Sequence, residues 1–266
     1  MDKDSIGNTF FVAVALCLVC SAFVALAAVG LRPIQEKNKA LDKKKNVLIA
    51  AGLCSKGDKI DVAQLFAERI VDRVIELSSG NDVTADLGDQ AATFDAEASL
   101  QEQGQFILVP PEQDIATLKK RENLAHVYLV KTSASDATPS QYVFPIRGKG
   151  LWSTCKGFLA INADLKTASG ITYYEDGETP GLGGEINSKE FQDKWPGKVI
   201  FGENNEVILE VSKSATSDHQ VDALSGATIT SKGVQYMIQY WLGPNGYGPY
   251  LDQLRSAQTG TQVTAQ

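Results

Sequence analysis

The sequence predicts a single N-terminal transmembrane helix followed by a soluble α+β domain with a mostly antiparallel sheet. Residues 10–31 form an uncharged apolar stretch, and at a rise of 1.5 Å per residue about 22 residues match a hydrocarbon core of about 30 Å. From residue 141 onward, short runs rich in β-branched and aromatic residues alternate with Gly, Asn and Pro, which is typical of strands joined by turns. A helical pattern closes this series, as an α+β domain requires.

The composition limits the function. The 266 residues are 43% hydrophobic and 21% charged, with a net charge of -7, which is an ordinary globular composition. Nucleic acid is not expected as a partner, because such binding depends on clustered Lys and Arg. Two histidines and four scattered cysteines predict no metal site and supply no catalytic triad, so no catalytic residue is assigned.

The stretch at 10–31 is interpreted as a membrane span preceded by a short tail at 1–9, with membrane lipid as its surroundings. A cleaved signal peptide is the alternative, since residues 25–27 (Ala-Leu-Ala) resemble a cleavage site. The apolar stretch is, however, longer than the 7–15 residues of a signal peptide's apolar region. Six basic residues follow the span between 32 and 45, whereas only Lys3 and the amino terminus precede it. Charge alone therefore places the rest of the chain in the cytoplasm.

Residues 32–60 are expected to be a basic connector, and residues 61–140 a helical or mixed subdomain. Apolar residues from Val62 to Leu77 keep helical spacing, and Asp61 is placed to cap that helix. Residues 127–130 (VYLV) have the composition of a strand. No chemistry is assigned to the polar segment 78–140.

Residues 141–243 are expected to form the functional domain. Its predicted strands are residues 142–146, 158–163, 171–175, 198–201 and 206–212. Apolar residues between Val234 and Leu242 predict a last helix, and Gly243-Pro244 predicts its end. Residues 244–266 are expected to be a C-terminal tail.

The segment Asp222–Ser231 lies directly before the last helix and contains Ser225, Gly226, Ala227 and Thr228. Small residues allow a ligand to approach the backbone, and the free N–H groups of a helix start favour a phosphate. The segment therefore predicts an anion-binding site. The alternative is that its hydroxyl side chains, Thr230 among them, only cap the helix.

Two further segments contain glycines in positions that suit a ligand. Residues 177–184 hold four glycines and a proline, together with Glu178, Thr179, Leu182 and Gly183, which predicts a loop with exposed backbone donors for a planar ligand. A plain surface loop is the alternative, and the glycine spacing is not that of a dinucleotide-binding fold. Trp152 follows two glycines and is a candidate to stack on a flat cofactor, although core packing is the commoner role of tryptophan.

Taken together, the N-terminal span and the segments 150–152, 178–183 and 222–228 resemble the FMN-binding domain family. Within it they are similar to the membrane-anchored flavin subunits of sodium-translocating NADH:quinone oxidoreductases. The resemblance implies that a dedicated flavin transferase joins FMN through its phosphate to Thr228, as a phosphodiester. Thr230 is the second candidate for attachment.

The resemblance also implies a function and a location. The chain would relay electrons through FMN within a membrane complex, with the other subunits of that oxidoreductase as partners. Its soluble domain would lie on the periplasmic side of a bacterial inner membrane, against the charge count. The alternatives are the related flavin subunit of ferredoxin-linked (Rnf) complexes, and a membrane-anchored binding domain without redox activity.

Overall fold

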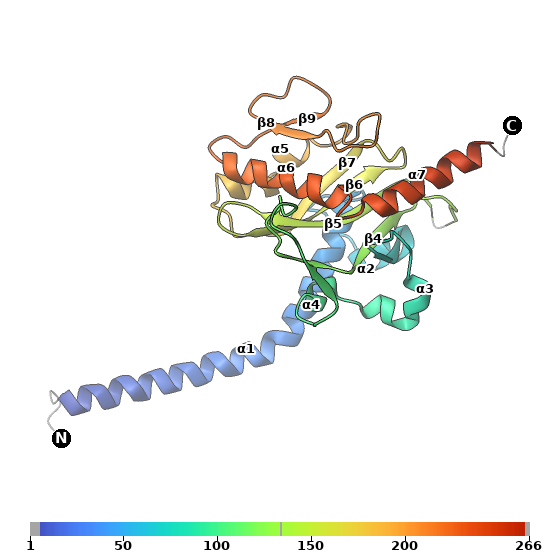
Figure 1. Cartoon of the computed structure of the whole chain (residues 1–266). Coiled ribbons are helices and arrows are strands. Elements are labelled where there is room, and N and C mark those ends of the chain that lie inside the picture. Colours follow the sequence, from blue (N-terminus) through green and yellow to red (C-terminus); the bar gives the residue numbers. More distant parts are fainter. Residues whose placement is uncertain (1–5, 134, 264–266) are drawn as a thin grey trace. The chain divides into compact units, whose positions relative to one another are not determined.

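The computed structural model describes residues 6–133 and 135–263. The chain divides into two compact units, Met1–Lys43 and Lys44–Gln266. Figure 1 shows the second unit as a sheet with helices packed around it. The predicted α+β class is confirmed.

Helix α1 (Ile6–Ala50) contains the predicted span and is, within the described residues, the one helix long and apolar enough to cross a membrane. Helical structure continues beyond the span despite Pro33, so the connector expected at 32–60 is wrong as far as Ala50. The lysine-rich stretch after Pro33 consists largely of good helix formers, and one proline is tolerated at the cost of a backbone hydrogen bond. The tail expected at 1–9 is helical from Ile6, and residues 1–5 lie outside the described part.

A five-stranded antiparallel sheet in the order β1-β4-β5-β6-β7 is the frame of the second unit. Its strands are β1 (Ile70–Glu76), β4 (Leu124–Val130), β5 (Gln141–Lys149), β6 (Thr154–Asn162) and β7 (Ala168–Glu175). The predicted boundary at residue 140 is wrong, because β4 pairs directly with β5, Tyr128 opposite Val143. Strands from both sides of that boundary form one sheet.

The helix expected from Asp61 to Leu77 is correct only in its first half. Helix α2 spans Val62–Arg69, and the Asp61 carboxylate caps it by accepting a hydrogen bond from the Gln64 N–H at 3.0 Å. The chain then enters β1 at Ile70. The run Ile-Val-Asp-Arg-Val-Ile is rich in β-branched residues, which favour a strand once a partner is available, and β4 supplies that partner.

Residues 84–122 form short elements beside the sheet. They are α3 (Thr84–Leu87), η1 (Gly88–Thr93), α4 (Ala96–Ser99) and the hairpin of β2 (Phe106–Leu108) with β3 (Lys120–Glu122). His126 of β4 joins this segment to the sheet, because its Nε2 contacts the Phe94 carbonyl oxygen at 3.0 Å while its Nδ1 contacts Asp72 Oδ1 of the neighbouring strand β1 at 2.8 Å. Because both partners only accept, the imidazole donates on both sides, and its raised pKa agrees with this: burial lowers the pKa, but the Asp72 carboxylate and the Phe94 carbonyl outweigh burial.

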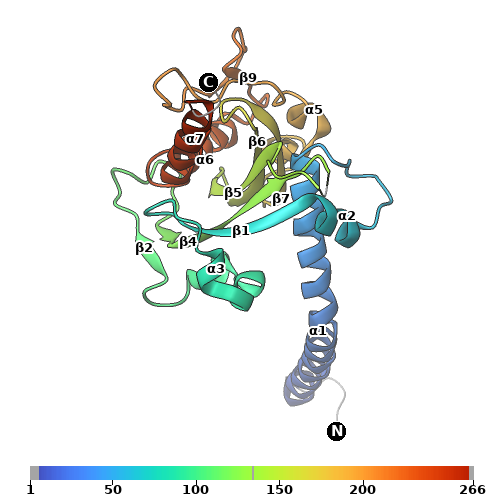
Figure 2. The same cartoon turned by 90° about the vertical axis from the view of Figure 1, so that its right-hand side faces the viewer.

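Side chains alternate between two cores on the two faces of the sheet. Phe144 and Leu159 pack in the larger core with α6 (Thr228–Leu242) and α7 (Gly248–Val263), whereas Val143 and Phe158 pack with the end of α1 and with α2. Figure 2 shows α6 and α7 together on one side of the sheet.

The C-terminal tail expected at 244–266 is wrong, because residues 248–263 form α7. Tyr247, directly before α7, and Tyr250 and Leu251 in its first turn are buried in the larger core. The Tyr247 hydroxyl also donates to the Pro145 carbonyl at 2.9 Å. Residues 264–266 lie outside the described part.

The chain between β7 and α6 leaves the main sheet. It forms η2 (Gly183–Asn187), α5 (Lys189–Gln192) and a small parallel pair of β8 (Glu210–Ser212) with β9 (Gln220–Asp222). The strand expected at 198–201 makes only isolated bridges, and the run at 206–212 is a strand over its last three residues. Of the strands predicted after residue 141, the first three are therefore those of the main sheet.

A substitution at Leu48 tests whether the end of α1 is buried as described. Leu48 is fully buried, so Leu48→Ala is expected to cost about 2–5 kcal/mol of unfolding free energy through lost apolar contact and a cavity. Denaturant unfolding of the full chain in detergent measures this cost. Ile60→Ala, at a position 37% exposed, is the control and is expected to cost under about 1 kcal/mol. Equal stability of the two variants would contradict the packing described.

Candidate functional site

Three segments far apart in the sequence meet at one end of the sheet. They are the turn at 150–153 between β5 and β6, the loop at 177–184 after β7, and the start of α6. All three contain motifs that the sequence predicted as ligand-binding. They meet at the side chain of Glu178.

The Glu178 carboxylate accepts hydrogen bonds from both neighbouring segments. Its Oε1 accepts from the N–H groups of Trp152 at 2.9 Å and Ser153 at 3.0 Å. Its Oε2 accepts from the Leu151 N–H at 3.2 Å and from the Thr230 hydroxyl at 2.7 Å. The carboxylate is thus fixed by donors on both oxygens, and it joins the three segments.

Glu178 is 6% exposed, yet its pKa lies below the ordinary glutamate value. Burial alone raises this pKa, but the hydrogen bonds from Thr230 and from the backbone of residues 151–153 outweigh burial. The folded protein therefore holds the ionised carboxylate. Because the folded pKa is depressed, the resulting stabilisation is complete above the unfolded pKa and is lost as the pH falls through the folded pKa.

Glycines allow the segments to approach this closely. A Cβ atom on Gly150 would lie 2.6 Å from Glu178 Oε1, and one on Gly183 would lie 2.6 Å from Thr230 Oγ1. Gly226 has a φ of +72°, and a Cβ atom there would lie 3.0 Å from Leu182 Cδ2. At all three glycines the atoms approached belong to the chain itself, so the close approach of a ligand to these glycines stays a prediction.

The start of α6 is open to an anion. Its N-cap residue, Ala227, has no side-chain capping bond, and the N–H groups of residues 228–230 have no acceptor within the described part of the chain. The alternative considered from the sequence, that hydroxyl side chains cap this helix, is wrong. Thr230 instead donates to Glu178, and the Ser231 hydroxyl oxygen accepts from the Leu224 N–H at 3.0 Å. Free N–H groups and the helix dipole favour a phosphate at this position.

Each of the three segments also exposes a large apolar side chain. Trp152 is 68% exposed, Ile229 59% and Leu182 44%. The expectation that Trp152 is a core residue is wrong, because its backbone N–H is bound to Glu178 while its ring lies at the surface. The Thr228 hydroxyl belongs to an exposed residue at the first position of α6. These groups fit a ligand with a phosphate at one end and a flat apolar ring at the other.

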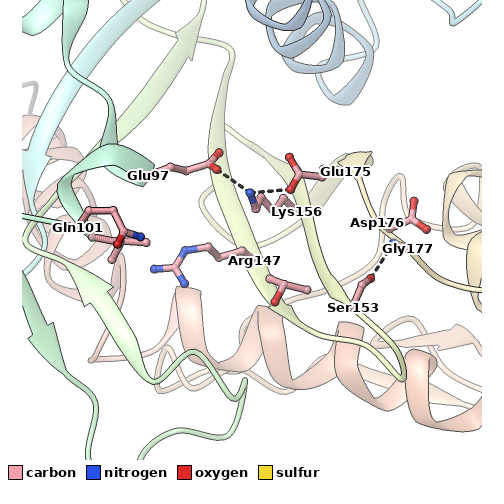
Figure 3. Close-up of a pocket in the computed structure, with 10 residues that line it drawn as sticks. Glu97, Gln101, Arg147, Ser153, Lys156, Glu175, Asp176 and Gly177 are labelled. Atoms are coloured by element: carbon pink, nitrogen blue, oxygen red, sulfur yellow. Dashed lines mark hydrogen bonds and ion pairs between the residues drawn. The ribbon is translucent and has the colours of Figure 1, made fainter. Parts of the chain in front are cut away.

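A cavity of about 600 Å³ lies behind this site and is lined by charged side chains. Figure 3 shows Lys156 between Glu97 and Glu175, with Nζ–O distances of 2.6 and 2.8 Å. Ser153 and Gly177 form its boundary with the site, and the Gly177 N–H donates to the Ser153 hydroxyl oxygen at 2.7 Å. Thr228, Leu182 and Trp152 are not among its lining residues. The cavity is therefore a separate, polar feature.

The sequence motifs locate the segments of the candidate site but miss two features at this end of the sheet. One is Ser153, whose N–H and hydroxyl support the Glu178 loop. The other is the charged cavity, whose lining residues are scattered between positions 97 and 177. A local motif carries no signal for either, because both depend on contacts between residues far apart in the sequence.

Known proteins with similar sequences cover nearly the whole chain. Residues 150–243 match the family described as FMN-binding domain. The NqrC subunit of the Na+-translocating NADH-quinone reductase of Neisseria meningitidis serogroup A is 48% identical over 96% of this chain and 97% of its own length. The corresponding subunit of Vibrio alginolyticus is 41% identical over 97% of this chain and 98% of its own.

Solved structures agree with the sequence comparison. The crystal structure of Shewanella oneidensis NqrC has a TM-score of 0.72 and 31% identity, covering 80% of this chain and 96% of that one. The corresponding subunit of the Na+-translocating NADH-quinone reductase from Parabacteroides distasonis has a TM-score of 0.61 and 26% identity, covering 83% of this chain and 96% of that one.

Gly183→Ala tests whether the three segments are packed as described. The added methyl group is expected to separate Thr230 from Glu178, at a cost of about 1–3 kcal/mol in unfolding free energy. Denaturant unfolding measures this cost. Gly57→Ala is the control, because nothing lies within 4 Å of its added carbon. Wild-type stability of Gly183→Ala would show that the loop is packed differently.

Proposed function

The chain belongs to the NqrC family of Na+-translocating NADH-quinone reductase subunits, and we propose that its FMN is joined covalently to Thr228. The chain is a flavoprotein subunit of a membrane-bound NADH-quinone reductase, and this membership is consistent with a role as an electron carrier. Residues 150–243 are its FMN-binding domain. The full-length similarity favours this function over the ferredoxin-linked and non-redox alternatives.

The observation that supports attachment at Thr228 is the position of its hydroxyl. Thr228 is exposed and is the first residue of α6, next to N–H groups that have no acceptor within the described chain. A phosphodiester on this oxygen would place its anionic oxygens against those N–H groups. Ser225, Gly226 and Ala227 form the approach to this position, with Gly226 supplying the positive φ.

Leu182 and Trp152 are proposed to contact the isoalloxazine ring. Both side chains are exposed, Leu182 approaches Gly226, and the backbone N–H of Trp152 donates to Glu178, which also binds Thr230 of α6. Thr179 shapes the loop that carries Leu182, because its carbonyl accepts from the N–H groups of Leu182 at 3.1 Å and Gly184 at 3.0 Å. Glu178 and Gly183 are buried behind this surface, so their proposed role is to position the loop.

The bound flavin supplies the electron-transfer chemistry, since FMN accepts and releases electrons singly or in pairs. The protein fixes its position and limits its contact with water, and no general acid or base is needed. The partners are the other subunits of the complex and, for maturation, a flavin transferase.

Helix α1 and the family support the proposed location. Helix α1 anchors the chain in the membrane, and its apolar residues at 10–31 are proposed to contact lipid. The unit from Lys44 onward is proposed to lie in the periplasm. The basic residues after the span favour the opposite side, but large domains cross membranes largely regardless of flanking charge.

Thr228→Val is expected to fold normally and to carry no covalent flavin, because it removes the attachment oxygen at an exposed position. The full chain is produced together with its flavin transferase, and the mass of the peptide containing residues 225–232 is measured by mass spectrometry. The wild type is expected to show one FMN-sized addition, and the variant none. Thr216→Val, another threonine outside the core, is the control. A wild-type peptide of unmodified mass would refute attachment at Thr228.

The topology is tested with reporters fused after Gln266. We expect activity from a reporter that works only outside the cytoplasm. A reporter that works only in the cytoplasm is expected to be inactive at the same position. The reverse pair of results would show that the positive-inside count decides the orientation.

A further inference from the structure

The start of α6 carries two threonine hydroxyls in opposite surroundings. Thr228 is exposed, whereas Thr230 is 2% exposed. Residues two apart on an α-helix point about 200° apart, so one of them faces outward when the other faces the protein. The same attachment chemistry is open in principle to both hydroxyls.

Neighbouring residues block the Thr230 hydroxyl from reacting with a flavin nucleotide. This hydroxyl donates to Glu178 Oε2 at 2.7 Å. The α carbon of Gly183 packs so close that even an added Cβ atom would lie 2.6 Å from Thr230 Oγ1. A phosphoryl group is far larger than a methyl group, so it reaches this oxygen only if the loop at 177–184 moves away.

Glu178 cannot follow Thr230 outward, because the backbone of residues 151–153 holds it from the other side. Its carboxylate is ionised, and so it stays an acceptor. The bond between Thr230 and this fixed carboxylate also sets the rotation of the first turn of α6. With Thr230 turned inward, Thr228 is turned outward.

We propose that Glu178 selects Thr228 over Thr230 for flavin attachment, by sequestering the Thr230 hydroxyl and fixing the first turn of α6. Glu178 is then a positioning residue, and the inference rests on the proposed attachment at Thr228. In the attachment step, Thr228 Oγ1 forms a P–O bond to the FMN phosphorus of a flavin nucleotide with a phosphoanhydride, such as FAD. The anhydride P–O bond breaks, the other nucleotide leaves with its phosphate, the hydroxyl proton is released, and no electron is transferred.

The test makes Thr230 reactive. Full-length chains are produced in cells with the flavin transferase and with FAD as the donor, and fragmentation of the peptide containing residues 225–232 locates the adduct. Thr228→Val alone is expected to show no adduct at Thr230. Thr228→Val with Glu178→Ala is expected to show an adduct at Thr230 at least about tenfold above the background signal measured for Thr228→Val alone, the ratio that corresponds to losing one charge-assisted hydrogen bond.

Glu185→Ala in the Thr228→Val background is the matched control. Glu185 lies in the same part of the chain, but its carboxylate accepts from the Gly181 N–H at 3.1 Å, within its own loop rather than from α6. No adduct at Thr230 is expected in this variant. Thermal unfolding of each variant establishes that it is folded.

Two results would overturn the inference. One is an adduct at Thr230 in Thr228→Val with Glu178 intact, and the other is no such adduct in the folded double variant. If the double variant does not fold, NMR is used to measure the rate at which the Thr230 hydroxyl proton of the wild type exchanges with water. Slow exchange is expected, and fast exchange would refute sequestration. A wild-type chain without FMN on Thr228 would instead refute the proposed function itself.

Discussion

The buried carboxylate of Glu178 is the interaction on which the site depends. It binds the backbone of the turn at 151–153 on one side and the Thr230 hydroxyl on the other. Hydrogen bonds to a charged group contribute about 1.5–3 kcal/mol each, and a buried charge that loses its donors is strongly destabilising. The ionised carboxylate of Glu178 is therefore stable in its buried position only if all three segments are in place. Each segment is in this way positioned by the other two.

The sheet makes this arrangement rigid. The turn at 150–153 joins β5 to β6, and the loop at 177–184 follows β7, so the paired strands fix both. Helix α6 is fastened to β5 by the Trp241 indole N–H, which donates to the Arg147 carbonyl at 2.7 Å. Sites carried by packed elements hold their geometry better than sites on free loops. The exposed Thr228, Leu182 and Trp152 are thus presented by a backbone that is set before any ligand binds.

Much of this organisation could be predicted from the sequence because its signals are local. The span at 10–31, the end of α6 at Gly243 and the segments proposed to bind FMN each depend on residues close in the chain. The wrong predictions fall where tertiary contacts decide. Residues 70–76 have helical spacing but become β1 because β4 pairs with them, and Trp152 is exposed because its turn binds Glu178. The bond from Thr230 to Glu178 joins positions 52 residues apart, and no local pattern predicts it.

If an ionised, hydrogen-bonded Glu178 holds the site together, its carboxyl group must titrate accordingly. The pH titration of its side-chain carboxyl carbon can be followed by NMR in the folded full-length chain, with the signal assigned by its absence from Glu178→Gln. We expect a midpoint below the ordinary value for glutamate, because the donors around the carboxylate favour its charged form. A midpoint at or above the ordinary value would mean that burial dominates and that the donors do not hold the carboxylate, and Glu178 could then not be the residue that joins the three segments.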